Sequence, residues 1–321
     1  MLRRTFLTLA SATLILASCK SSGPVTSTDG VQKVKLALNW VPEPEFGGFY
    51  AARESGAFSK EKLEVEIQGG GAGVPVIQMV ATGKAEFGIA GADEILTARA
   101  QGADVVALFA TYQKSPQGIM THAARGASGL KDVLASGLIA LEPGLPYAGF
   151  LAQKYGKFGA KVVPYDGGVA HFLADPTFSQ QCYVTSEPIA AKRNGSDPQV
   201  FLIADEGFNP YVGVVITSRA YAAQHAELVA AFTRAVGAGW ATYLASPDAT
   251  NAVMQKLNTS MDAETFRAAA AAQKPLIEGD DAATKGVGAM TQERWDTFAK
   301  QLTALGVLKQ APVIDFLVSG K

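Results

Sequence analysis

Short strand-like runs alternate with helical segments along this chain, and this alternation limits its fold more than any other feature. Residues 34–38 and 63–67 alternate apolar and polar side chains in the manner of half-buried strands. A segment that begins at Pro75 and stops at Gly83 has the start and stop residues of a short helix. Strands separated by helices are expected to run parallel, with the helices as crossovers. The sequence therefore predicts an α/β fold.

The alternation occurs in two blocks. The first block ends with a predicted strand at 105–112, and the second contains predicted strands at 138–141, 161–165, 181–185 and 200–203. Segments 113–118 and 209–217 are interpreted as crossings between the blocks. From Ser218 to its end the chain is rich in alanine and helical in period, without strand signals.

Two α/β blocks joined by two short connections describe two lobes around a cleft. We predict that residues 34–115 together with 215–321 form lobe 1, and that residues 116–214 form lobe 2. Open α/β sheets bind ligands at the carboxyl ends of their strands, so these ends are expected to face each other across the cleft. Hinge closure around a ligand is the natural motion of such a pair.

Residues 1–19 have the features of an export signal. Arg3 and Arg4 precede a mostly apolar run that is shorter than the roughly 20 residues a membrane-spanning helix needs. The ending Leu16-Ala17-Ser18-Cys19 resembles the lipobox of bacterial lipoproteins, in which the cysteine becomes the first mature residue and carries the lipid. We therefore predict a signal peptide at 1–19, lipidation of Cys19 and a flexible tether at 20–33. An ordinary cleaved signal with an incidental cysteine is the alternative.

The composition indicates a globular chain without a nucleic-acid partner. Hydrophobic residues make up 48% and charged residues 18% of the 321 residues, which allows a sizeable core. The formal net charge is −1, and Lys and Arg form no cluster outside the extreme N-terminus. If Cys19 is acylated, Cys182 is the one remaining cysteine, and its place within a predicted strand favours a buried, inert thiol.

Common signatures of enzymes and metal sites are not found in the sequence. The three histidines, His122, His171 and His225, form no His-Glu-x-x-His pair and no zinc-binding spacing with cysteine. The sequence contains no Gly-x-Ser-x-Gly elbow. We therefore expect a binding protein that uses neither a cofactor nor a metal ion.

Asn39 and Trp40 leave the first predicted strand at its carboxyl end. A tryptophan at this place offers a flat apolar face to a ring, and the asparagine amide both donates and accepts hydrogen bonds. The alternative is that Trp40 is packed in the core. Glu43 and Glu45 follow shortly after and are expected to be solvated loop charges.

Three further candidates lie in lobe 1. Tyr50 belongs to the first predicted helix, behind two glycines that let a ligand approach backbone N–H groups, and its alternative role is to fill the core. Gly71 and Ala72 lie in a glycine-rich run that lacks the Lys and Ser/Thr of a Walker A sequence. We interpret this run as a close approach of the backbone to a small ligand, with a plain flexible connection as the alternative.

Tyr147 and Glu187 are the candidates from lobe 2. Tyr147 opens a predicted helix just after a strand, which makes its position the counterpart of those in lobe 1. Glu187 follows Thr185 and Ser186 at a strand end, where a carboxylate suits a donor-rich ligand such as an aminopyrimidine. The alternative role of Glu187 is that of a first-turn carboxylate on the helix dipole.

Three stretches together carry a family resemblance, namely Val34–Phe58, Gly69–Gly102 and Phe172–Ala191. They resemble type 2 periplasmic binding proteins, and within them the thiamine-pyrimidine-precursor and nitrate/taurine-like branch. The resemblance implies a two-lobed fold, a stacking role for Trp40, and a role for Glu187 in meeting the amino group of a pyrimidine. Asn39 is similar to a polar residue that is common before that tryptophan. The chain departs from the family at Glu43-Pro44-Glu45-Phe46, where relatives carry an Asn/Thr/His-rich stretch.

The resemblance also implies a function and its partners. We expect an exported, lipid-anchored and monomeric solute-binding protein that delivers a ligand to an ABC permease driven by an ATPase. The expected ligand is a thiamine-type pyrimidine or another small heteroaromatic, with a flavin or related vitamin precursor as an open possibility. A small anion such as a sulfonate, nitrate or bicarbonate is the alternative, and it requires Arg or Lys in the cleft. The rival from another class is a pyrimidine-synthase-like enzyme, whose cysteine-rich motif this chain lacks.

Overall fold

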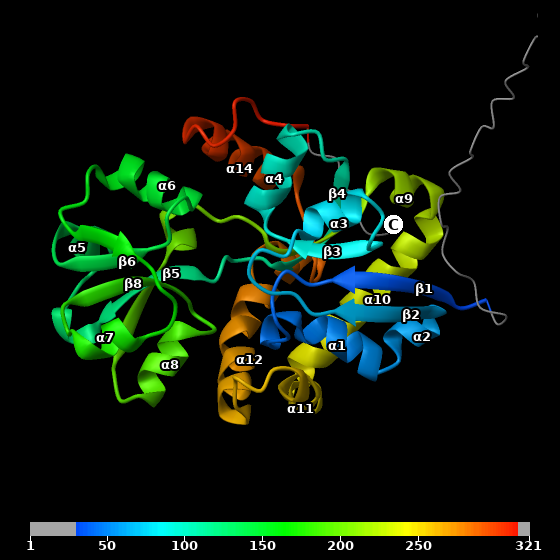
Figure 1. The fold of residues 1–321 in the computed structure, drawn as a ribbon, viewed down its shortest axis with the longest axis horizontal. Helices are drawn as coiled ribbons and strands as arrows, with labels where there is room; N and C mark the ends of the chain where they lie inside the picture. Colours follow the sequence, from blue (N-terminus) through cyan, green and yellow to red (C-terminus); the bar gives the residue numbers. More distant parts are fainter. Residues whose placement is uncertain (1–29, 314–321) are drawn as a thin grey trace, which may run out of the picture.

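The structure, a computed structural model, describes residues 30–313 and contains two five-stranded sheets that lie side by side (Figure 1). The predicted signal peptide, Cys19 and most of the predicted tether lie outside the described residues. We use lobe 1 for the first sheet with the helices packed on it, and lobe 2 for the second. The residue boundaries given above for the two lobes stay a prediction.

The sheet of lobe 1 has the strand order β2-β1-β3-β10-β4. Strand β1 runs parallel to both β2 and β3, while β10 runs antiparallel to both β3 and β4. The strands are β1 (Gln32–Ala37), β2 (Leu63–Gln68), β3 (Phe87–Ala90), β4 (Val105–Tyr112) and β10 (Val212–Ser218). Its first helices are α1 (Gly47–Glu54), α2 (Ala57–Lys60), α3 (Val76–Ala81) and α4 (Ala92–Ala100).

The sheet of lobe 2 repeats this topology with the order β7-β6-β8-β5-β9. Strand β6 runs parallel to β7 and β8, and β5 is the antiparallel strand that corresponds to β10 of the first sheet. The strands are β5 (Gln117–His122), β6 (Leu138–Leu141), β7 (Lys161–Pro164), β8 (Phe178–Tyr183) and β9 (Pro198–Leu202). Its helices are α5 (Leu130–Ala135), α6 (Pro146–Tyr155), α7 (Ala170–Ala174) and α8 (Glu187–Arg193).

The two crossings are shorter than the sequence predicted. Most of 113–118 and 209–217 was expected to be connection, but β5 begins at Gln117 and β10 begins at Val212. Each of these strands enters a sheet directly after a crossing and pairs with two neighbours antiparallel. Antiparallel strands of this kind need no crossover helix, so the alternation of strand and helix does not reveal them.

The chain after β10 is helical, as predicted. It forms α9 (Arg219–Gln224), α10 (Ala226–Ala245), α11 (Asp248–Leu257), α12 (Ala263–Glu278), α13 (Asp281–Lys285) and α14 (Gln292–Ala304). Helix α10 lies close against α1, because a Cβ placed on Gly48 would stand 2.2 Å from the Trp240 ring and one on Gly239 would stand 2.2 Å from the Gly48 oxygen. These glycines therefore set the distance between the two helices.

Buried side chains connect the two lobes as well as filling each of them. One cluster packs α1, α2 and α10 against the first sheet, while α3 and α4 cover its other face (Figure 1). A second cluster includes Ile95 of α4, Leu151 of α6 and Trp295 of α14. Helix α14 thus joins lobe 1 to lobe 2 although it is the last helix of the described chain. No helix among residues 30–313 has the length and apolar character needed to span a bilayer.

Candidate functional site

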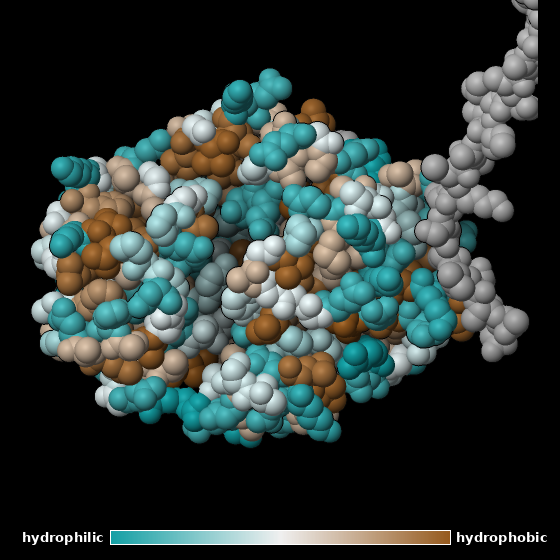
Figure 2. Space-filling view, in the orientation of Figure 1, coloured by the Kyte–Doolittle hydropathy of each residue, from teal (hydrophilic) through white to brown (hydrophobic). Residues whose placement is uncertain are grey.

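A cavity of about 350 Å³ lies where the two sheets face each other. Its lining comes from the ends of β1 and β3 in lobe 1, from β8 and the start of α6 in lobe 2, and from both crossings. The surface is hollowed between the two lobes (Figure 2). The polar lining residues are Asn39, Asp93, Glu94, Ser115, Gln117, Glu142, Tyr147, Gln181, Tyr183 and Tyr211.

Asn39 and Trp40 are neighbours in the chain, but only Asn39 is among the residues that line this cavity. Asn39 lines it, and its side-chain Oδ1 is buried without a hydrogen-bond partner among the described residues. Trp40 is 43% exposed, so it is not part of the core. Its indole Nε1 donates a hydrogen bond to Glu43 Oε1 at 3.2 Å. The tryptophan therefore presents an open ring face whose edge is held in place by a carboxylate.

Glu43 and Glu45 are not the solvated loop charges that the sequence suggested. Both are partly buried, because the intervening Pro44 belongs to a short 3-10 helix (Pro44–Phe46) that packs into lobe 1. The backbone oxygen of Pro44 accepts a hydrogen bond from Gln273 Nε2 at 2.8 Å, which holds this segment against α12. Local sequence cannot reveal a contact with a residue so distant along the chain.

Burial alters the acidity of these two carboxyl groups. It raises the pKa of Glu43 to about 7, with the negative charge of Glu187 acting in the same direction and the Trp40 hydrogen bond opposing it. Burial also raises the pKa of Glu45 to about 8, and the charge of Glu43 adds to this shift. Both groups are therefore partly protonated near neutral pH.

Asp93 and Glu94 bring two more carboxyl groups to the cavity at the start of α4. Glu94 Oε2 accepts a hydrogen bond from the Gly91 backbone N–H at 2.8 Å, which fixes the first turn of the helix. Burial raises the pKa of both Asp93 and Glu94. Asp93 and Glu94 were not singled out from the sequence, yet their place shortly after the buried strand β3 was a usable signal.

In lobe 2, Tyr147 lines the cavity as part of a polar network. Its hydroxyl donates to Gln181 Oε1 at 2.6 Å, and the Glu142 backbone N–H donates to the same oxygen at 2.6 Å. Gln181 and Glu142 were not singled out from the sequence. They follow from the pairing of β6 with β8, which brings the ends of these two strands together.

Glu187 is the first residue of α8 and is held by two hydrogen bonds. Its Oε1 accepts from the Tyr165 hydroxyl at 2.5 Å and its Oε2 accepts from the Tyr183 backbone N–H at 2.8 Å. The negative charge of Glu187 in lobe 2 contributes to the raised pKa of Glu43 in lobe 1, the residue that accepts the Trp40 hydrogen bond. Glu187 does not itself line the cavity of about 350 Å³.

The other candidates from lobe 1 lie away from the cavity lining. Tyr50 is 1% exposed within the core of lobe 1, with the Arg53 guanidinium 5.0 Å from the centre of its ring. Gly71 and Ala72 lie on the loop before α3, where Gly71 is partly buried and Ala72 is exposed. A ligand contact by any of these three residues stays a prediction.

The cavity is acidic. Its lining contains Asp93, Glu94 and Glu142, and none of the described lining residues is Lys, Arg or His. Tyr183 lies at the centre of this charge: burial, and then the negative charges of four carboxylates, raise the pKa of its hydroxyl. These carboxylates are Glu45, Asp93, Glu187 and Glu94. Carboxylates of both lobes therefore contribute to a negative electrostatic potential at the Tyr183 hydroxyl.

The described residues offer no metal site and no activated thiol. No group of three or more His, Cys, Asp and Glu side chains between residues 30 and 313 is arranged to hold a metal ion. Cys182 is buried in lobe 2, and burial raises the pKa of its thiol well above the usual value. A thiol in this state is a poor nucleophile.

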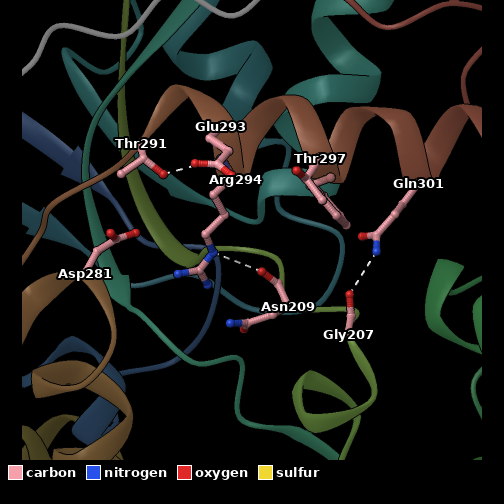
Figure 3. A pocket seen from close by; sticks show the side chains of 9 residues that line it. Gly207, Asn209, Asp281, Thr291, Glu293, Arg294, Thr297 and Gln301 are labelled. Atoms are coloured by element: carbon pink, nitrogen blue, oxygen red, sulfur yellow. Dashed lines mark hydrogen bonds between the residues drawn. The ribbon is translucent and has the colours of Figure 1, made fainter.

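A second cavity, of about 340 Å³, lies beside the crossing that leads into β10 (Figure 3). The guanidinium carbon of Arg294, a residue of α14, lies 3.9 Å from the centre of the Tyr211 ring. Arg294 Nε donates a hydrogen bond to the backbone oxygen of Asn209 at 3.1 Å. The side-chain Oδ1 of Asn209 accepts a hydrogen bond from the Ser115 backbone N–H at 2.8 Å, and this bond joins the two crossings. This network lies where the two crossings pass between the lobes.

A model of the protein family described as NMT1/THI5 like matches residues 43–250. A formylaminopyrimidine-binding protein of Halalkalibacterium halodurans is 24% identical over 96% of this chain and 95% of that protein. The riboflavin-binding protein RibY of Chloroflexus aurantiacus is 26% identical over 94% of this chain and 92% of its own length.

Solved structures with the same fold include a binding protein and an enzyme. The periplasmic aliphatic sulphonate binding protein SsuA of Escherichia coli has a TM-score of 0.67 at 12% identity, covering 90% of this chain and 94% of its own. The desulfurization enzyme DSZB has a TM-score of 0.60 at 14% identity, covering 88% and 95%. These likenesses confirm the predicted two-lobed fold.

Proposed function

This chain belongs to the NMT1/THI5-like family, and from that premise we propose that it is the solute-binding component of an ABC importer for a small heteroaromatic ligand. The relatives named above bind a formylaminopyrimidine and riboflavin, both of which are ring systems that carry hydrogen-bonding groups. The observation that carries the proposal is the cavity shared by both lobes, which has acceptor oxygens on its walls and an exposed tryptophan in the chain position directly after Asn39 of its lining. Its volume is of the size that small ligands occupy.

Each lobe has a part in the proposed binding event. Trp40 of lobe 1 stacks on the ring, while the amide oxygen of Asn39 and the carboxylate of Glu187 accept hydrogen bonds from its amino groups. Tyr147 forms part of the wall in lobe 2. Closure of the two lobes about the crossings at Ser115 and Asn209 then shields the ligand from water.

The proposed binding function also implies where in the cell the protein acts. An exported binding protein hands its ligand to a membrane permease, and the ATPase of the importer drives uptake. We propose that residues 1–19 direct export and that a lipid on Cys19 anchors the protein, with residues 20–33 as the tether. We further propose that the protein acts as a monomer and without a cofactor.

A panel of ligands tests the proposal directly. The purified protein is heated with an aminopyrimidine, riboflavin and an alkanesulfonate in turn, and its melting temperature is measured. A ligand at 100 times its Kd stabilises the folded state by about 2.7 kcal/mol, a shift of several degrees. A shift with the aminopyrimidine or riboflavin is expected. Stabilisation by the sulfonate alone would contradict the proposal.

Two alternative functions, sulfonate binding and catalysis, each have one specific observation in their favour. SsuA supports a sulfonate ligand, but the described lining of the cavity contains no cation to receive one. DSZB shows that this fold also supports catalysis. Incubation of the protein with the bound heteroaromatic, followed by mass spectrometry of the small molecules, separates binding from turnover. Recovery of the ligand unchanged is expected, and product formed over many turnovers would establish an enzyme.

A further inference from the structure

Two neighbouring side chains of lobe 2 form a donor and acceptor pair on the cavity wall. Gln181 lies in β8, and Glu142 is the first residue after β6, the strand that pairs with β8. Both residues line the cavity of about 350 Å³. Gln181 Nε2 donates a hydrogen bond to Glu142 Oε2 at 3.3 Å. A ligand in the cavity therefore meets a hydrogen-bond donor and an acceptor next to each other in this wall.

The orientation of the Gln181 amide is fixed by its surroundings. Its Oε1 accepts one hydrogen bond from the Tyr147 hydroxyl and one from the Glu142 backbone N–H, both at 2.6 Å. Because these two donors use both lone pairs of the amide oxygen, the other end of the amide is Nε2. Gln181 and Tyr147 are only 6% and 4% exposed. The opposite orientation would set the amide N–H groups against two buried donors, which is costly.

The pair has hydrogen-bonding capacity that the protein itself does not use. Gln181 Nε2 carries two N–H bonds, and the described residues supply an acceptor for one of them, Glu142 Oε2. Buried donors in folded proteins nearly always have a partner. The Glu142 side chain is exposed, and its carboxylate receives no other hydrogen bond from residues 30–313. One N–H and several carboxylate lone pairs are therefore available to a ligand.

We propose that Glu142 and Gln181 recognise the edge of the ligand ring at which an N–H donor lies beside an acceptor, as the amino group and ring nitrogen of an aminopyrimidine do. The Glu142 carboxylate accepts a hydrogen bond from the amino group, and Gln181 Nε2 donates one to the ring nitrogen. This inference rests on the proposed function and names the class of heteroaromatic that the cavity accepts. The pair acts in addition to Glu187.

Amide side chains recognise the same kind of edge in nucleic acids. A single Asn or Gln contacts adenine by accepting from the amino group with its oxygen and donating to the ring nitrogen with its N–H. In this cavity the Gln181 oxygen is already occupied by Tyr147 and the Glu142 backbone, so the Glu142 carboxylate takes the accepting role. Tyr147 acts through Gln181 and is a positioning residue.

The same pair disfavours a ligand that offers acceptors alone. The oxygens of an alkanesulfonate satisfy the Gln181 N–H, but they bring no donor to Glu142 and their negative charge faces its carboxylate. Like charges at close range raise the cost of the wrong ligand, which gives specificity as effectively as a new attraction does. Glu142 therefore both selects for the amino group and selects against the anion.

A matched pair of pyrimidines tests the proposal. One is a methylated aminopyrimidine, and in the other a methyl group of nearly the same size replaces the amino group, so that the ring nitrogen stays and the N–H donor is lost. Their Kd values are measured by titration calorimetry with the wild-type protein. We expect the amino compound to bind about tenfold tighter or better, since tenfold corresponds to about 1.4 kcal/mol.

Two variants assign the preference to the two residues. In Glu142→Ala the amino compound is expected to lose most of its advantage, while the Kd of the methyl compound stays within a few-fold. Gln181→Glu keeps an acceptor for Tyr147 and for the Glu142 N–H but has no N–H to donate. It is expected to weaken both compounds about tenfold and to leave the ratio between them. This split distinguishes the two roles from a general loss of structure.

Matched substitutions at exposed positions serve as controls. Glu227→Ala at the start of α10 and Gln224→Glu at the end of α9 are expected to leave both Kd values unchanged. Circular dichroism monitors the fold of each variant. Because Glu142 is exposed, Glu142→Ala carries the test alone if Gln181→Glu does not fold.

The outcomes separate this inference from the proposed function. Equal binding of the two compounds to the wild type would overturn the recognition of the edge and leave the binding function intact. An advantage of the amino compound that survives Glu142→Ala would remove the role of Glu142. If riboflavin binds in place of the aminopyrimidine, its analogue methylated at the ring N–H replaces the methyl compound, with the same expectations. If no heteroaromatic in the panel binds, the proposed function itself fails, and the inference with it.

Discussion

Arg193 and Asp262 form a two-point ion pair that ties lobe 2 to lobe 1. Arg193 Nη1 lies 2.7 Å from Asp262 Oδ1 and Nη2 lies 2.6 Å from Oδ2. The Asp262 side chain also accepts from the Thr265 N–H at 2.9 Å and so caps α12. Arg193 is the last residue of α8, the helix whose first residue is Glu187. The helix that carries the lobe 2 carboxylate is therefore fastened to lobe 1 at its other end.

Arg193→Gln is expected to weaken ligand binding by favouring an open cleft. Both partners are exposed to solvent, so the effect is modest, about two- to fivefold in Kd. The ligand-free variant is expected to have a larger radius of gyration in small-angle X-ray scattering than the wild type. Arg234→Gln is the control, since Arg234 forms a similar two-point pair with Glu61 within lobe 1. Equal effects of the two substitutions would contradict a role for the Arg193 pair in closure.

The raised pKa values of Glu43 and Glu45 predict that stability falls as the pH rises. Both groups have an ordinary pKa of 4.5 when unfolded, but about 7 and about 8 when folded. Between these values the folded state binds more protons than the unfolded state, so the free energy of unfolding decreases with pH. Each pKa unit corresponds to about 1.4 kcal/mol, so the two shifts together amount to a loss on the order of 8 kcal/mol at most.

Urea unfolding of the ligand-free protein at several pH values between the unfolded and folded pKa measures this loss. The double substitution Glu43→Gln with Glu45→Gln is expected to flatten the dependence, and Asp93 and Glu94 maintain a smaller slope of the same sign. A stability that rises with pH across this range in the wild type would show that the two carboxyl groups ionise normally.

Trp40→Ala is expected to abolish most ligand binding and leave the fold intact. Because the side chain is 43% exposed, the free energy of unfolding is expected to change by less than about 0.5 kcal/mol. Loss of the stacking face is expected to raise the Kd about tenfold or more. Trp40→Phe keeps a ring but loses the hydrogen bond to Glu43, so it separates stacking from positioning.

Leu257→Ala is the matched control for Trp40, because Leu257 is 55% exposed at the end of α11. It is expected to leave the Kd unchanged. Calorimetric titration gives the affinities, and circular dichroism monitors the fold. A Trp40→Ala protein that is largely unfolded would show that the ring supports the structure instead of the ligand.

Much of the fold was predictable because parallel strands and crossover helices leave a local pattern. The strand at 34–38, the helix stop at Gly83 and the helical chain after Ser218 depend on residues near one another in the sequence. Strands β5 and β10 do not, since their antiparallel partners lie far away in the sequence: β8 and β9 for β5, and β3 and β4 for β10. Their pairing is a property of the assembled sheets.

Site residues that follow the end of a strand could be predicted from the sequence. Residues whose burial depends on packing against distant parts of the chain could not. Asn39 and Tyr147 follow strands directly, and the structure places both at the cavity. Glu43 and Glu45 look like solvated charges from their neighbours alone. Their burial depends on contacts of the preceding and intervening prolines with α11 and α12, such as Asn258 Nδ2 donating to Pro42 O at 3.1 Å. Those partners come more than 200 residues later.

Asn209→Ala is expected to destabilise the protein by breaking the tie between the crossings. The substitution leaves the Ser115 N–H without its acceptor and removes the donor to Gln113 O at 3.3 Å. An unsatisfied buried donor costs about 1–3 kcal/mol, which chemical denaturation measures readily. Asn209→Asp keeps the acceptor for Ser115 and is expected to lose less. Asn194→Ala, at an exposed position after α8, is the control and is expected to cost under about 1 kcal/mol. Equal stability of the Asn209→Ala and wild-type proteins would show that the crossings are held by packing alone.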